Sequence, residues 1–192
     1  HGLDAFIFDV YFIEDSERKL EYKVLKSITD STLSMDQIEN LFPDPDNDLA
    51  NAAKKAGNII FAQSFKPQGK KKEPVKKRTE VMERRLKLLE ERNLFRTVDP
   101  KQYSSLFDFY DIETVVDTLI KNSAGVYFFQ SDPDPDGLQR KYPLVGLYED
   151  KIFPSASLAI ALQHYGVPFD SVEIIPGNVI RFDLPKTDEH GR

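Results

Sequence analysis

Residues 48–65 read DLANAAKKAGNIIFAQSF, and within these residues the pattern changes from helix to strand. Asp48 is suited to the N-cap of a helix over Leu49–Ala56, and Gly57 is suited to the left-handed position that ends it. Asn58–Phe65 predicts a strand, because isoleucine and phenylalanine make up most of its apolar content. A helix that leads directly into an apolar strand is typical of layered α/β folds.

A second apolar run precedes this unit. Phe6–Phe12 is interrupted only by Asp9, as is typical of a strand covered on both faces in a parallel sheet between helices. Helical spacing over residues 16–28, and again from Ser34 up to Pro43, predicts two helices between the strands. Strand, helix and strand in this order favour a sheet with a parallel part.

The second half of the chain contains the clearest helical pattern. Over residues 111–122 the apolar residues recur at i, i+3, i+4, i+7 and i+8, and Asp111 can cap the first turn. Val126–Phe129 then predicts a strand. This helix and strand continue the alternation of the first half.

Antiparallel pairing is expected nearer the C-terminus. Tyr142–Tyr148 and residues 152–153 predict strands joined at a tight turn, and a helix capped by Ser155 follows them. Val172–Ile175 and Val179–Phe182 predict a last hairpin. The predicted fold is therefore α/β, a layered mixed sheet with a parallel part and C-terminal antiparallel hairpins, flanked by helices.

Lys66–Arg85 differs in composition from its surroundings, with nine Lys or Arg residues against three Glu. Its first half contains the consecutive Lys70–Lys72 and predicts a solvated loop, whereas its second half has helical spacing. We interpret residues 66–93 as a basic helical insertion between core elements. The chain is expected to form a single domain over residues 1–185, followed by a polar tail over residues 186–192.

Composition excludes several classes of protein. The 192 residues are 40% hydrophobic and include 14 Phe and 8 Tyr, far too many for a disordered chain. The longest apolar stretch, Ala5–Ile13, is shorter than the roughly 20 residues that cross a bilayer. Zero Cys excludes disulfides, thiolate catalysis and cysteine-held metals, and the net charge of −6 argues against a nucleic-acid partner.

Two acidic loops are the candidate metal sites. Asp132–Gly137 places carboxylates at positions 1, 3 and 5 of a calcium loop, followed by the glycine of the bend. The position that should hold a bidentate Glu is Pro143, so a simple turn is favoured. Asp44, Asp46 and Asp48 form the second cluster, best explained as a loop that leads into a helix. We therefore expect no metal and no cofactor, and a calcium-stabilised structural module is kept as an alternative.

Asp9 raises the question of catalysis. Its strand invites comparison with haloacid-dehalogenase-type phosphatases, in which a nucleophilic carboxylate is followed two residues later by a carboxylate acid/base. The second position here is Tyr11, so an Asp-dependent phosphate-ester hydrolase is kept only as an alternative. A buried aspartate needs a partner, and Arg140 is the expected one.

Four segments, taken in order, carry a family resemblance. The first is Phe6–Phe12, an apolar strand with an embedded Asp, and the second is Asp48–Ala52 with a strand behind it. The third is Asp134–Leu144, which has the pattern Asp-x-Asp-Gly-x-x-Arg-x-x-Pro-Leu, and the fourth is Phe153–Ala159, similar to a Pro-Ser-Leu-Ala helix start. Together they cover nearly the whole chain and resemble the CHASE2 family of extracytoplasmic sensor domains.

The resemblance implies a role in signal input rather than catalysis. CHASE2 domains lie outside the cytoplasmic membrane, are anchored by transmembrane helices, and are attached to adenylate or guanylate cyclases, histidine kinases or Ser/Thr kinases. We therefore expect the extracytoplasmic (periplasmic) ligand-sensing domain of a bacterial inner-membrane receptor, itself not an enzyme. The family normally begins with a further strand and helix before the Asp-bearing strand, and the sequence has neither there.

Five polar residues are the candidate ligand-binding site: Asp9, Asp48, Asp134, Asp136 and Arg140. Open α/β sheets usually place their sites at strand ends, where these residues are expected to meet. Each also has a structural explanation, with Asp48 as a helix cap, Asp136 in a turn and Asp9–Arg140 as a buried pair. The expected partner is an unknown small ligand or ion, with a homodimer allowed and nucleic acid excluded.

Overall fold

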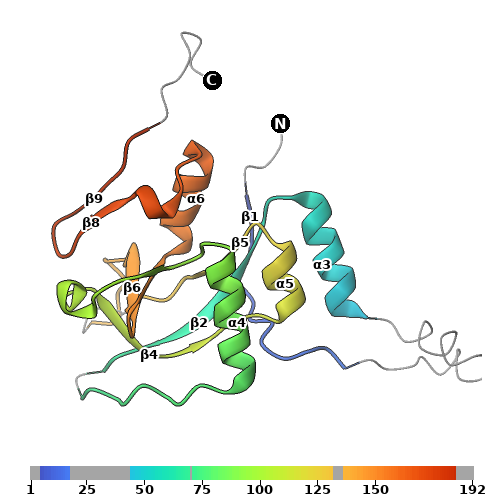
Figure 1. Ribbon diagram of the computed structural model, residues 1–192, viewed down its shortest axis with the longest axis horizontal. Coiled ribbons are helices and arrows are strands. Elements are labelled where there is room, and N and C mark those ends of the chain that lie inside the picture. Colours follow the sequence, from blue (N-terminus) through green and yellow to red (C-terminus); the bar gives the residue numbers. More distant parts are fainter. Residues whose placement is uncertain (1–4, 18–43, 70, 132–135, 185–192) are drawn as a thin grey trace, which may run out of the picture.

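The computed structural model describes residues 5–17, 44–69, 71–131 and 136–184. In these residues the chain forms a mixed sheet with parallel and antiparallel strands, a separate β-hairpin and four α-helices, which confirms the predicted α/β fold (Figure 1). The helix expected behind Ser34, and all but the first two residues of the one expected over residues 16–28, lie outside the described residues.

The strands and helices of the fold have the following bounds. The strands of the main sheet are β1 Phe6–Phe8, β2 Ile59–Pro67, β3 Arg96–Thr97, β4 Phe107–Glu113, β5 Gly125–Phe128, β6 Val145–Tyr148 and β7 Lys151–Pro154. The helices are α3 Pro45–Ala56, α4 Glu80–Glu91, α5 Asp117–Asn122 and α6 Ala156–Tyr165. The separate hairpin consists of β8 Glu173–Ile175 and β9 Val179–Arg181.

The long strand β2 organises the sheet, whose strand order is β1-β2-β4-β6-β7-β3 with β5 also paired to β2. The first half of β2, residues 59–63, pairs in parallel with β1 and β5. Its second half, residues 64–67, pairs antiparallel with β4. The predicted parallel part and the predicted β6–β7 and β8–β9 hairpins are therefore confirmed.

Aromatic side chains fill the space enclosed by the strands. Phe65 of β2 contacts Phe109, Phe128 and Phe153 with ring centroids 4.6, 5.4 and 5.0 Å away. A parallel bridge between Phe128 and Ser155 also brings the end of β5 beside the end of β7. The strands thus curve around a core that comes from four of them, and pairs of this geometry add stability beyond their buried area.

Three helices lie side by side as one layer, with α5 between α3 and α4 (Figure 1). The fourth helix, α6, packs on β5 and β7 and covers a second, smaller core together with the β8–β9 hairpin. Ser155 caps α6 and Gly166 ends it with φ +65°, as predicted. None of the described helices is long and apolar enough to cross a membrane.

The first strand differs from its prediction. β1 ends at Phe8, and its Phe6 side chain is 45% exposed, so the expected strand over residues 6–12 with both faces covered is wrong. Among the described strands, β1 pairs only with β2 and forms an edge of the sheet. An apolar run at an edge has the same sequence pattern as a central strand, and the pattern alone does not separate the two cases.

The helix expected over residues 111–122 is also wrong in its first half. Residues up to Glu113 belong to β4, and α5 begins only at Asp117. Ile112, at the end of β4, and the apolar residues up to Ile120 are all buried in the core. Their spacing resembles that of one helix because the strand and the helix that follows it after a bend both bury their apolar side chains. Asp111 lies in the strand and caps no helix.

The other corrections concern α3 and α4. Asp44, not Asp48, is the N-cap of α3: its Oδ1 accepts a hydrogen bond from the Asn47 N–H at 3.1 Å. Gly57 ends α3 with φ +74°, as predicted. The α4 helix is not an insertion outside the core, because Leu86 and Leu89 are 3% and 0% exposed and belong to the main core.

Candidate functional site

The structure separates most of the predicted site residues. Asp136 and Arg140 form an exposed ion pair at 2.8 Å on the segment between β5 and β6. Asp9 is exposed immediately after β1, so the expected buried Asp9–Arg140 pair is wrong. Asp48 is exposed in the first turn of α3, and Asp134 lies outside the described residues.

Asp9 nevertheless belongs to a small polar cluster at the carboxyl ends of β1 and β5. Gln130 donates a hydrogen bond to the Tyr11 hydroxyl at 2.6 Å, and the Tyr142 hydroxyl donates to the Phe128 carbonyl at 3.3 Å. Burial, followed by the negative charge of Asp9 and the proximity of the ionisable Tyr11 hydroxyl, raises the pKa of Tyr142 to about 12. The cluster lies on the surface. Within the described residues no three His, Asp or Glu side chains are grouped to hold a metal ion.

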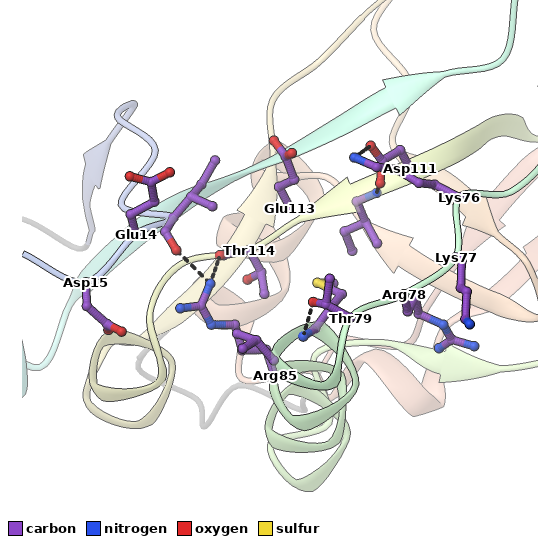
Figure 2. Close-up of a pocket in the computed structure, with 14 residues that line it drawn as sticks. Glu14, Asp15, Lys76, Lys77, Arg78, Thr79, Arg85, Asp111, Glu113 and Thr114 are labelled. Atoms are coloured by element: carbon purple, nitrogen blue, oxygen red, sulfur yellow. Dashed lines mark hydrogen bonds and ion pairs between the residues drawn. The ribbon is translucent and has the colours of Figure 1, made fainter.

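A charged pocket of about 400 Å³ lies elsewhere, beside the end of β4 (Figure 2). Three segments far apart in the sequence form its walls: Ile13–Asp15 after β1, residues 76–79 with Val81 and Met82 at the start of α4, and Asp111–Thr114 at the end of β4. Arg85, one turn into α4, also lines it. A volume of this size falls within the roughly 300–1,000 Å³ of small-molecule sites.

Backbone hydrogen bonds hold these walls in place. The Lys76 N–H donates to the Tyr110 carbonyl at 3.1 Å, which fastens the basic segment to β4. The Val116 N–H donates to the Phe12 carbonyl at 2.9 Å, which fastens the segment after β1 to the one after β4. Thr79 caps α4, with its hydroxyl accepting from the Met82 N–H at 3.2 Å. The pocket is therefore built on anchored backbone.

Arg85 joins the three segments through a single guanidinium group. Its Nη1 donates to the carbonyls of Ile13 and Thr114 at 2.7 and 3.1 Å, and its Nε donates to Asp117 at 3.2 Å. The side chain is only 7% exposed. Its Nη2 has no hydrogen-bond partner among the described residues and is not sealed from solvent. An arginine fork suits this task because its donors lie in one rigid plane.

Asp117, the first residue of α5, forms an ion pair with this arginine. Burial opposes ionisation of its carboxyl group, but hydrogen bonds from Arg84 and Arg85 outweigh burial and lower its pKa. Arg84 is the more exposed partner, with 59% of its side chain accessible and an Nε–Oδ2 distance of 2.7 Å. The two arginines thus tie α4 to α5.

Asp111 forms the main ion pairs of the opposite wall. Its Oδ2 lies 3.1 Å from Lys66 Nζ and 3.2 Å from Lys76 Nζ, and its side chain is 9% exposed. The hydrogen bond that Lys66 Nζ donates to Asp111 is the main cause that raises the pKa of Lys66. Both lysines are therefore already paired with the Asp111 carboxylate.

Charges of opposite sign remain available on the two sides of the pocket. Figure 2 shows Glu14 and Asp15 on one side and Lys77 and Arg78 on the other, with Thr114 between them. Glu14, Asp15 and Lys77 make no hydrogen bond or ion pair with any residue that the structure describes. The Thr114 hydroxyl is buried and also lacks a partner within the described ranges.

Sequence reasoning missed this pocket, because the basic segment was interpreted as an insertion. One signal could have found it. Arg85 stands three residues after Met82 and four before Leu89, on the apolar stripe of α4. A charge on the buried face of a helix needs partners from elsewhere in the fold.

Comparison of the chain with protein families, with curated proteins and with solved structures finds no match.

Proposed function

We propose that this chain is a ligand-sensing domain, itself not catalytic, of a membrane-anchored bacterial receptor, and that the pocket beside Arg85 is its sensory site. The observation that carries the proposal is the pocket itself, a cavity of about 400 Å³ with charges on both sides that have no partner among the described residues. The extracytoplasmic location and the attached cyclase or kinase output rest on the CHASE2 resemblance of the sequence.

The arrangement of Arg85 supports sensing. A ligand that enters the pocket lies between the segment after β1, the end of β4 and the start of α4, which this arginine links. A ligand shifts a conformational equilibrium only if it binds one arrangement more tightly than another. Contacts to three separately held segments provide such a difference, because their relative positions determine whether all the contacts form together.

The test is a thermal-shift screen of the purified chain against small polar solutes, namely amino acids, dicarboxylates, diamines, sugars and nucleotides. A ligand that binds only the folded state adds about 2.7 kcal/mol of stability at 100 times its dissociation constant. We expect at least one solute to raise the melting temperature.

Val81→Trp should abolish that shift, because Val81 lines the pocket on the first turn of α4 and is 43% exposed, so the indole can occupy the cavity. Val75→Trp is the matched control, since Val75 is equally exposed at 42% but does not line the pocket. The proposal fails if no solute stabilises the chain, or if Val81→Trp binds it as well as the control does.

A further inference from the structure

We infer that the ligand of the pocket is a small zwitterion, an amino acid or a compound of the same charge pattern, with a cationic and an anionic group at its two ends. The inference rests on the proposed function and specifies the chemistry of the same site. It follows from which charges of the pocket are already paired and which are not.

The cationic end of the ligand fits the side formed by Glu14 and Asp15. Both side chains are exposed and line the pocket, and neither has a partner among the described residues. They follow Ile13, whose carbonyl is held by Arg85 at 2.7 Å, so their backbone is fixed beside the cavity. Two unpaired carboxylates on an anchored segment are a site for an ammonium group.

The anionic end fits the opposite side, where Lys77 is the available cation. Lys76 is paired with Asp111, and Arg78 is paired with Glu83 and Glu149 at 3.1 and 3.0 Å. Lys77 makes no such contact within the described part of the chain. It precedes the start of α4, where an anion is also favoured by the helix dipole.

The backbone at the start of α4 provides a further donor for an anion. The N–H groups of Met82 and Glu83 are bonded to Thr79. That of Val81, which lines the pocket, has no partner in the described residues and can donate to a carboxylate. The side that receives the anionic end of the ligand thus offers a side-chain ammonium and one backbone donor.

Thr114, which lies between the two charged sides, provides independent evidence for a ligand in this pocket. The Thr114 hydroxyl lines the pocket and is buried without a hydrogen-bond partner among the described residues. Most buried polar groups in proteins have a partner, so each exception calls for an explanation. A polar ligand seated between the two charged sides supplies it.

Ligands with a single type of charge fit less well. A dicarboxylate would place one carboxylate against Glu14 and Asp15, and a diamine would place one ammonium against Lys77. Like charges in contact cost affinity without any compensating gain. A zwitterion of amino-acid size satisfies both sides at once within about 400 Å³.

The experiment is a titration of the purified chain, by calorimetry and thermal shift, with the common L-amino acids, succinate, putrescine and glucose as the probes. We expect at least one amino acid to bind, and succinate, putrescine and glucose not to bind. Glu14→Gln with Asp15→Asn, and separately Lys77→Gln, should each weaken amino-acid binding at least tenfold. Lys87→Gln, an exposed lysine on α4 outside the pocket, should change it less than twofold.

The outcomes separate this inference from the function on which it rests. If succinate, putrescine or glucose binds in place of amino acids and Val81→Trp blocks it, the zwitterion is wrong and the sensory pocket stands. If an amino acid binds with unchanged affinity in the Glu14, Asp15 and Lys77 variants, the inference is also overturned. If no solute of any class binds, both proposals fail together.

Discussion

Replacing Arg85 with methionine should destabilise the fold strongly. Methionine matches the length of the arginine stem but supplies none of its donors. The substitution leaves the carbonyls of Ile13 and Thr114 without their hydrogen bonds and removes one of the two arginines that hold Asp117. These groups lie at the junction of three segments, so no neighbouring element can replace the lost contacts.

The magnitude follows from the number of groups left unpaired. Each buried polar group without a partner costs about 1–3 kcal/mol, and removal of one member of a buried ion pair costs about 3–5 kcal/mol. We therefore expect Arg85→Met to lower the free energy of unfolding by about 3–5 kcal/mol, measured by urea titration with far-ultraviolet circular dichroism. The melting temperature should fall by roughly 6–20 °C, from about 2–4 °C per kcal/mol for a chain of this length.

Arg84→Met is the matched control. Arg84 contacts the same carboxylate of Asp117, but its side chain is 59% exposed. Exposed ion pairs contribute about 0–1 kcal/mol, so this variant should remain close to the original stability. If the two variants lose the same small amount, Arg85 does not hold the three segments together and the reasoning is wrong.

Three further predictions concern stability, each measured as the free energy of unfolding in urea. Gly146→Ala should cost about 1–3 kcal/mol, because the added methyl group overlaps the ring of the fully buried Phe109; an unchanged stability would contradict this packing. Gly57→Ala should cost about 1 kcal/mol because of its φ of +74°, and Gly69→Ala, which requires no positive φ, should cost much less. The folded-state pKa of Asp117 is lowered, so its stabilisation is complete above the ordinary value of 3.8 and is lost as the pH falls through the folded-state pKa. Asp117→Asn should therefore flatten the loss of stability in acid, and equal slopes for the two proteins would refute the assignment.

Local signals in the sequence were sufficient to predict helix ends and tight turns, because these features depend on local interactions. Ser155 and Gly166 bound α6 as predicted, and Gly57 ends α3, because caps and left-handed positions depend on a few neighbouring atoms. The β6–β7 hairpin was predicted for the same reason. Its turn contains Glu149 at φ +55°, a conformation that residues in tight turns adopt.

Features that depend on long-range packing could not be predicted in this way. The apolar positions between Ile112 and Ile120 were identified correctly as core, but their spacing fits a helix as well as a strand followed by a helix. The candidate aspartates were chosen because of their local patterns, whereas the pocket assembles residues near positions 14, 77, 85 and 114. Arg85 on the apolar stripe of α4 indicates a need for partners, but the local sequence does not indicate which regions provide them.

The pairing of β2 determines whether the two parts of the molecule stay together after the chain is cleaved. The segment at residues 71–77 is exposed, and cleavage there would divide the chain into a piece with β1, α3 and β2 and a piece with all the later elements (Figure 1). β2 pairs with β5 along its first half and with β4 along its second half, and both partners belong to the other piece. A nicked molecule would therefore keep its two fragments associated through two strand ladders, with no peptide bond between them.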